Sequence, residues 1–202
     1  MSKRQLSVIV GIFAMALLLF SSPGFPGASV SPMSIIKTGT DRALQILKEP
    51  HAPGSQVRRN AIMKIVDDYF NYGEMARRAL GRPWKEQSPE KQREFVTLFR
   101  QLLFNTYMDK VENYTGGNEK VLYDGEQIEG NYALVKTRIT GYNNKDIQLD
   151  YKLYSDAGQW QVYDVVVEGI SFINNYRQQF NSILTNEPFD NLLARMRQKS
   201  AL

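Results

Sequence analysis

The chain has 202 residues, of which 43% are hydrophobic, 11% aromatic and 23% charged. This composition is typical of one folded domain with a substantial core, and it excludes disordered and collagen-like proteins. Cysteine is absent and histidine occurs once, at His51. The sequence therefore excludes disulfide bonds, thiolate or multi-histidine metal sites and cysteine nucleophiles, and we expect neither a cofactor nor a metal ion.

The first segment has the features of an export signal. Lys3 and Arg4 precede fifteen uncharged residues, 6–20, and small residues follow. Fifteen apolar residues are short for a membrane span, which needs about 20. The pattern predicts a secretory signal peptide over residues 1–28, cleaved between about 24 and 31, and a single mature domain over residues 32–202. In a bacterium that domain would be periplasmic; an uncleaved anchor is the alternative.

Removal of the signal also removes two bases, so the net charge falls from +4 to +2. Such a small charge gives no reason to expect a nucleic-acid partner. The region from Arg58 to Lys85, which includes Arg77 and Arg78, is locally basic. It is either a solvated helix surface or a contact for anionic headgroups or an acidic partner.

Helix signals dominate the first half of the mature chain. Ser31 and Ser55 are placed to cap the first two helices, and Gly81 is placed to end the third. The helices are expected at Pro32–Glu49, from Ser55 to about Phe70, near Glu74–Leu80 and from Pro89 to about Asn113. Their apolar stripes include Ile36, Ala43, Leu44, Leu47, Ile62, Ile65, Val66, Tyr69, Phe70, Phe95, Phe99 and Leu102.

From about residue 120 the apolar residues recur with a period of two, which indicates strands. Turn residues separate four of them, at Lys120–Ile128, Asn131–Tyr142, Lys145–Ser155 and Gln159–Glu168. A three-residue loop over 156–158 would pair Tyr151 with Tyr163 and Leu149 with Val165. The fourth strand is apolar on both faces, so we expect it to be covered on both. Two closing helices, with stripes over 172–184 and 189–196, complete an α+β fold in which helices pack on a four-stranded antiparallel meander.

Most catalytic patterns are missing from the sequence. No nucleophile elbow, phosphate loop, dinucleotide fingerprint or zinc-protease motif occurs. His51 lies in a proline-rich segment and is expected to be inert. The pair Asp67-Asp68 and Asp150 are expected to be solvated, and Asp124, Glu126 and Glu129 to form a charged hairpin end rather than a cation site.

Asp164 is the exception, because it lies inside the most apolar strand. A buried carboxylate must be paired or hydrogen-bonded, or it holds its proton. The structural interpretation gives it a partner such as Arg177 or a backbone amide, which would join the sheet to a helix. The alternative is a lone catalytic acid of a small hydrolase or isomerase, although no second catalytic group is visible.

The run from Trp160 to Phe180 has a specific pattern, carried by Trp160, Asp164, Glu168, Gly169, Tyr176 and Arg177. It resembles the signature of the toluene-tolerance family. The stretch from Tyr69 to Trp84 resembles a second block of that family, except that Asn71 stands where members often carry aspartate. The resemblance covers nearly all of the mature chain.

The resemblance implies a non-enzymatic periplasmic shuttle that holds a diacyl phospholipid in an apolar cavity between the sheet and the helices. Its implied partners are an outer-membrane lipoprotein complex and an inner-membrane ABC transporter complex with a substrate-binding ring protein. The implied role is to maintain the lipid asymmetry of the outer membrane. Some relatives are associated with hopanoids, so a polycyclic cargo is the alternative within this class. An interaction module that uses the Arg58–Lys85 region is a third hypothesis.

Strand parity and helix periodicity, not the family, select the residues that would line such a cavity. The motif residues named above are expected to determine the fold. The lining residues are expected to be Phe99, Leu102, Val135, Ile139, Ile147, Leu149, Tyr151, Tyr163, Val165 and Val167.

Overall fold

The computed structural model describes residues 30–49, 55–112, 119–142 and 145–200. The predicted signal peptide and His51 lie outside these ranges. Within them, no helix has both the length and the hydrophobicity needed to cross a membrane.

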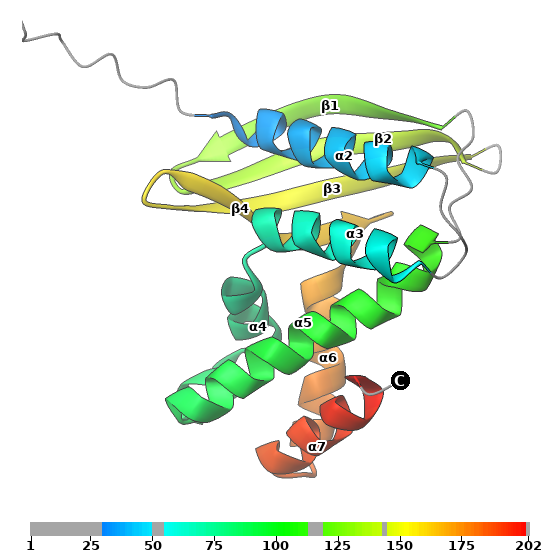
Figure 1. The fold of residues 1–202 in the computed structure, drawn as a ribbon. Helices are drawn as coiled ribbons and strands as arrows, with labels where there is room; N and C mark the ends of the chain where they lie inside the picture. The colour runs from blue at the N-terminus through cyan, green and yellow to red at the C-terminus, as the bar shows by residue number, and fades with distance from the viewer. Residues whose placement is uncertain (1–29, 50–54, 113–118, 143–144, 201–202) are drawn as a thin grey trace, which may run out of the picture. The chain divides into compact units, whose positions relative to one another are not determined.

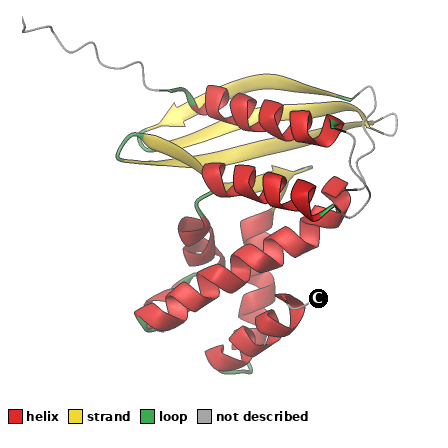
Figure 2. Ribbon diagram, viewed as in Figure 1, coloured by secondary structure: helices red, strands yellow, loops and turns green. Residues whose placement is uncertain are grey.

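The sheet is an antiparallel meander of five strands in the order β1-β2-β3-β4-β5 (Figure 1). Four strands were predicted, and the fifth, which has only two residues, was missed because two residues show no periodicity. The α+β class is confirmed, with helices and strands in separate layers (Figure 2). The strands are β1 (Lys120–Glu129), β2 (Tyr132–Tyr142), β3 (Lys145–Asp156), β4 (Gln159–Val167) and β5 (Ile170–Ser171).

The predicted helices are present, and their caps explain where they begin. Ser31 and Ser55 cap the first two, as expected, and Ser171 caps the helix that follows β5. The third helix begins before the predicted Glu74 because the Asn71 side chain accepts a hydrogen bond from the Glu74 amide at 2.9 Å. The helices are α2 (Pro32–Lys48), α3 (Gln56–Tyr69), α4 (Tyr72–Leu80), α5 (Pro89–Glu112), α6 (Phe172–Leu184) and α7 (Phe189–Ser200), with a short 3-10 helix at Arg82–Glu86.

The predicted register between β3 and β4 was wrong. The turn has two residues, Ala157 and Gly158, and both have positive φ, as in the tight turns that suit twisted hairpins. A bulge then leaves Tyr163 without a cross-strand partner. As a result Tyr151 pairs with Val165, and Leu149 pairs with Val167.

Two hydrophobic cores support this fold. One is helical and lies among α4, α5, α6 and α7, around the stacked rings of Phe95 and Phe99. The other lies between α2 and the sheet, around Val135, Leu153 and Val162. Helix α3 packs beside α2 and also contacts α5 and β4. It therefore lies between the two cores, and the candidate site lies along it.

Candidate functional site

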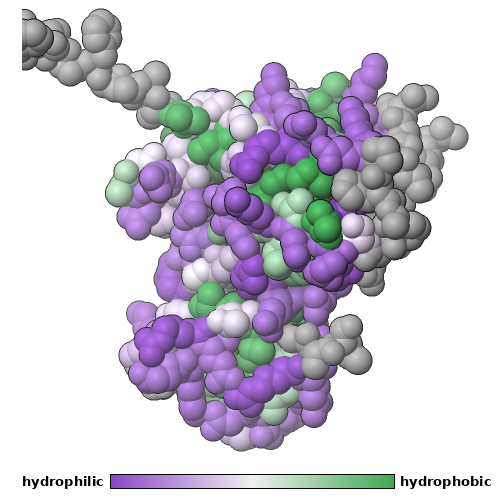
Figure 3. All heavy atoms as spheres, viewed as in Figure 1, coloured by the Kyte–Doolittle hydropathy of each residue, from purple (hydrophilic) through white to green (hydrophobic). Residues whose placement is uncertain are grey.

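Two neighbouring apolar cavities lie between the helices and the sheet. The α2–α3 cavity has a volume of about 290 Å³, and its walls come from α2, α3 and β1–β4. The α3–α5 cavity has a volume of about 260 Å³, and its walls come from α3, α4, α5, β3, β4 and the start of α6. Figure 3 shows hydrophobic side chains reaching the surface between α2 and α3. The two cavities share Ile62, Val66, Phe70, Leu149 and Tyr151.

The structure brings together part of the predicted lining set. Leu149 and Tyr151 line both cavities, Ile139 lines the α2–α3 cavity and Val165 lines the α3–α5 cavity. Val135 and Val167 belong to the core between α2 and the sheet without lining either cavity. Ile147 pairs with Ile139 across the sheet and is half-buried beside the same face.

Three predicted residues lie elsewhere. Phe99 is fully buried in the helical core. Leu102 contacts a larger and more polar cavity among α5, α6 and α7, whose walls include Arg59, Arg195 and Lys199. The β4 bulge places Tyr163 under the guanidinium of Arg78, which lies 4.0 Å from its ring centroid. Tyr163 lines a small surface pocket with Tyr132 instead of the apolar cavities.

Most of the lining residues that were not predicted from the sequence belong to α2 and α3. Their apolar stripes were recognised as buried helix faces, but periodicity does not distinguish a face packed on a core from one that lines a cavity. The missed lining residues of these two helices are Ile35, Ile36, Gly39, Thr40, Ala43, Leu44, Leu47, Ile62, Ile65, Val66 and Tyr69.

Among the described side chains that line the two cavities, none is a carboxylate or a cation. Their polar groups are the hydroxyls of Thr40 and of the tyrosines. Burial raises the pKa of Tyr151 and of Tyr72 well above the ordinary value, so both phenols are neutral at physiological pH. A neutral, apolar wall suits a hydrocarbon ligand.

Charged groups lie at the edges of the cavities, beside aromatic residues that line them. The guanidinium of Arg42 lies 5.8 Å from the Tyr69 ring centroid, and that of Arg100 lies 5.8 Å from the Tyr72 centroid. Arg42 and Arg100 form ion pairs with Asp68 and Asp67, respectively. The predicted solvated pair is therefore exposed, but each carboxylate has an arginine partner.

Asp164 has a structural role, which was one of the two interpretations of this residue. Its carboxylate accepts hydrogen bonds from the Ile173 amide at 3.1 Å and the Ser171 hydroxyl at 2.7 Å. Lys152 lies 3.3 Å away. The carboxylate thereby fixes the start of α6 on β4, and its burial beside Val165 confirms that β4 is covered on both faces.

Arg177 is not the partner of Asp164, contrary to one of the expectations. It donates two hydrogen bonds, of 2.9 and 2.6 Å, to the carbonyl oxygen of Arg78. This contact satisfies a carbonyl near the end of α4, where helices leave such groups without partners. The motif arginine therefore joins α6 to α4.

The other motif residues also shape the fold. Glu168 and Gly169 form the turn between β4 and β5, with φ of 49° and 78°. The Glu168 carboxylate accepts a hydrogen bond from the Gln148 amide, which holds this turn against β3. Tyr176 is buried in the helical core, and Trp160 packs beside the core under α2.

Two of the three acidic residues expected at the hairpin end have separate partners. Asp124 pairs with Arg138 at 3.0 Å, and Glu126 accepts a hydrogen bond from the Met33 amide at the start of α2. The described residues contain no cluster of acidic or histidine side chains that could hold a metal ion. Asp150, expected to be solvated, is buried, and one of its oxygens accepts from the Gln148 side chain.

Comparison with known proteins places this architecture in a family. The family model described as MlaC protein matches residues 37–198. The chain belongs to the MlaC family. Asn71, the family departure noted in the sequence, keeps an oxygen acceptor at the α4 cap, where aspartate is equally favoured.

Two curated relatives are similar over most of the chain. One is the intermembrane phospholipid transport system binding protein MlaC of Haemophilus influenzae, 23% identical over 86% of this chain and 84% of the relative. The other is the toluene tolerance protein ttg2D of Pseudomonas putida, 23% identical over 81% of this chain and 78% of the relative.

A solved structure shows the same fold. It is a phospholipid-binding protein from Ralstonia solanacearum in complex with a phospholipid. The TM-score is 0.75 and the sequence identity is 21%, over 84% of this chain and 96% of the other.

Proposed function

We propose that this MlaC-family chain is a carrier that holds a diacyl phospholipid by its acyl chains and moves it through an aqueous compartment. The observation that carries this proposal is the pair of apolar cavities on either side of α3. Membership of the MlaC family and the phospholipid in the Ralstonia solanacearum structure support the same ligand class.

The free-energy cost of exposing acyl chains to water explains why a lipid carrier needs an apolar cavity. Two acyl chains with roughly 30 methylenes cost on the order of 20 kcal/mol to expose to water, at about 0.8 kcal/mol per methylene. A free lipid therefore leaves a membrane extremely slowly. A protein that replaces the water around the chains with side chains such as Leu149 and Val66 removes most of that barrier.

The compartment and partners follow from the sequence and the family. We propose that residues 1–28 are a cleaved signal peptide and that the domain works in the periplasm. Its exchange partners would be an outer-membrane lipoprotein complex and an inner-membrane ABC transporter with a substrate-binding ring protein. The name of the Haemophilus influenzae relative, an intermembrane phospholipid transport system binding protein, supports this assignment.

The structural role of Asp164 favours the carrier over the enzymatic alternative. Asp164 accepts two hydrogen bonds that fix α6 to β4, and the described side chains that line the two apolar cavities include no carboxylate and no histidine. The interaction-module hypothesis requires no apolar cavity, whereas the described part of the chain contains the α2–α3 and α3–α5 cavities.

Native mass spectrometry tests the proposal directly. The mature protein, purified from the periplasm without detergent, should carry an adduct with the mass of a diacyl phospholipid, which extraction then identifies. A hopanoid-sized adduct would keep the carrier class and change the cargo. A protein that is bare, and stays bare after incubation with phospholipid vesicles, would refute the carrier function.

A further inference from the structure

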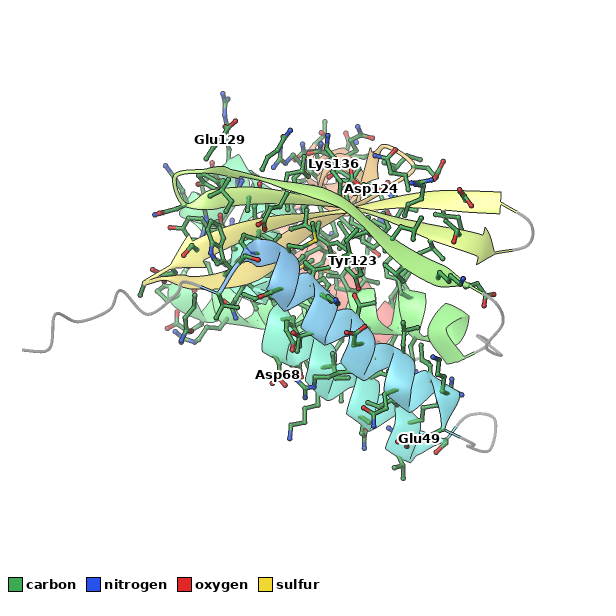
Figure 4. All side chains as sticks on the ribbon, turned by 90° about the horizontal axis from the view of Figure 1, so that it is seen from above. Glu49, Asp68, Tyr123, Asp124, Glu129 and Lys136 are labelled. Carbon is green, nitrogen blue, oxygen red and sulfur yellow. The ribbon has the colours of Figure 1, made fainter. Side chains whose placement is uncertain are left out.

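Apart from Thr137, whose hydroxyl donates to the Leu149 carbonyl, three hydroxyl groups interrupt the apolar inner side of the sheet and the helix that faces it. They belong to Thr40 on α2, Tyr123 on β1 and Tyr151 on β3. Thr40 and Tyr151 line the α2–α3 cavity, and Tyr151 also lines the α3–α5 cavity. Tyr123 lines neither cavity, but it packs in the same core as Tyr151 and pairs with Thr137 of β2. Figure 4 shows Tyr123 on the helix side of the sheet and Asp124 on the other side.

Electrostatic coupling between these groups shows that they are close. Burial raises the pKa of Tyr151, Tyr123 raises it further, and the Thr40 hydroxyl lowers it. Burial also raises the pKa of Tyr123, and Thr40 again lowers it. One threonine hydroxyl on α2 therefore lies near the oxygens of both phenols.

The Tyr123 hydroxyl lacks the hydrogen bond that a buried polar group normally makes. Its oxygen is buried, and although the Thr40 hydroxyl lies near it, no described group meets the geometric criteria for a hydrogen bond to it. Buried polar groups in folded proteins are nearly always hydrogen-bonded, because leaving one unpaired loses the bonds it made to water. A neutral phenol O–H is a donor, so the missing partner is an acceptor.

A diacyl phospholipid offers few hydrogen-bond acceptors that an apolar cavity could hold. Its methylenes accept no hydrogen bond, and its charged headgroup would be costly to bury against a wall whose described side chains include no cation. The acyl ester carbonyls are neutral acceptors, and in a diacyl lipid they lie where the two chains diverge. Tyr151 lines both cavities. A lipid whose ester groups lie beside Tyr151 could therefore extend one acyl chain into each cavity.

We propose that Thr40, Tyr123 and Tyr151 form a hydrogen-bonding site for an acyl ester carbonyl of the bound lipid. This inference rests on the proposed function and deepens it, because it names the part of the lipid that the protein recognises. The apolar walls select for hydrocarbon in general, and the three hydroxyls select for ester-linked chains. A carrier with this site distinguishes a glycerolipid from a hydrocarbon or a sterol-like molecule of similar volume.

A pair of matched lipids isolates the carbonyl. Dipalmitoyl phosphatidylcholine and its dihexadecyl ether analogue have the same headgroup and chains of the same length, but only the ester has carbonyl oxygens. We expect the delipidated wild-type protein to bind the ester about 3- to 10-fold more tightly, the net worth of about one neutral hydrogen bond. Tyr123→Phe should bind both lipids with equal affinity, near that of the wild-type protein for the ether.

The same variant separates a ligand site from a structural hydroxyl. Because Tyr123→Phe removes an unpaired buried group, the lipid-free protein should keep its Tm or gain about 2 °C. A structural hydroxyl would instead lower the Tm of the lipid-free protein. Thr40→Val, which also keeps the side-chain volume, should reduce the ester preference and serves as a second variant.

Tyr132→Phe is the matched control, since this half-exposed ring lines the surface pocket with Tyr163. It should keep the full ester preference. Equal wild-type affinity for the two lipids, or a preference that survives in both Tyr123→Phe and Thr40→Val, would overturn the ester site while leaving the carrier function intact. Failure of the wild-type protein to bind either lipid would overturn both.

Discussion

Arg100 of α5 donates two hydrogen bonds to the carboxylate of Asp67 on α3, from Nε to Oδ1 at 2.7 Å and from Nη2 to Oδ2 at 2.5 Å. The next residue, Asp68, pairs with Arg42 of α2 at 3.4 Å. Adjacent carboxylates on α3 thus connect this helix to both of its neighbours, one beside each cavity. A lipid that enters either cavity from the side must separate α3 from one of these neighbours, so the two ion pairs resist opening.

Loss of the stronger pair should accelerate lipid exchange. In Asp67→Asn we expect the rate of phospholipid transfer from vesicles to rise about two- to fivefold, because opening no longer breaks a bidentate ion pair worth about 0.4–1 kcal/mol. The pair is partly exposed, so the free energy of unfolding should fall by less than about 1 kcal/mol. Stopped-flow measurement with a fluorescent phospholipid gives the rate.

Asp190→Asn is the control for this prediction. It removes the ion pair between Asp190 and Lys91, which joins α7 to α5 and involves no residue that lines the two cavities. Its transfer rate should equal that of the wild-type protein. An unchanged rate in Asp67→Asn would show that opening does not separate α3 from α5.

Leu149 is the most direct test of the cavities, since it lines both. Leu149→Trp should fill space in each and reduce the bound phospholipid at least about fivefold, at a stability cost within the 1–3 kcal/mol typical of overpacking. Native mass spectrometry measures the lipid content, and circular dichroism confirms the fold. Leu122→Trp makes the same change at an exposed position of β1 and should leave the lipid content unchanged. Wild-type lipid content in folded Leu149→Trp would place the ligand elsewhere.

Asp164→Asn distinguishes a structural residue from a catalytic one. The amide offers one acceptor oxygen to the Ile173 amide and the Ser171 hydroxyl, which now bind two carboxylate oxygens. We expect the free energy of unfolding to fall by about 1–3 kcal/mol in urea titrations, with lipid binding retained in the folded fraction. The exposed Asp156→Asn is the control and should cost little. An unaltered stability would contradict the role of Asp164 in joining α6 to β4.

Local signals in the sequence predicted most of the elements. Ser31 and Ser55 cap helices as expected because an N-cap depends on a few neighbouring residues. The β3–β4 register was less accessible, since it depends on whether the extra residue lies in the turn or in a bulge. The structure places it in the bulge at Tyr163. The β4 residues before the bulge, such as Val162, therefore lie on the opposite face from the one assumed, whereas Val165 and Val167 keep the assumed face.

The candidate site was predicted only in part, and for a physical reason. Ile139, Leu149, Tyr151 and Val165, which strand parity grouped together, lie along the two cavities. Phe99 does not, because its helical stripe is buried against other helices. An apolar stripe shows that a face avoids water, but whether it meets side chains or a cavity depends on the distance between elements that are far apart in sequence.

A last prediction concerns pH and the contact between α4, the sheet and α6. Glu74 accepts hydrogen bonds from Arg77 at 2.6 and 2.8 Å and from Arg78 at 2.6 Å. Burial raises the pKa of the Glu74 carboxyl, but the two arginines outweigh it and hold the pKa below its usual range. The same Arg78 lies over Tyr163 and offers its carbonyl oxygen to Arg177. The carboxylate of Glu74 thus orients a residue that contacts both other elements.

The sign of the effect follows from the lowered pKa. The unfolded chain binds the proton more readily, so Glu74 contributes stability above its unfolded pKa of about 4.3, and that contribution is lost as the pH falls further. Glu74→Gln should lower the free energy of unfolding by about 1 kcal/mol at pH 7 and by much less at pH 3. Urea titrations at both pH values measure it. The exposed Glu86→Gln should change little at either pH, and an equal loss at both pH values in Glu74→Gln would show that the charge of Glu74 contributes nothing.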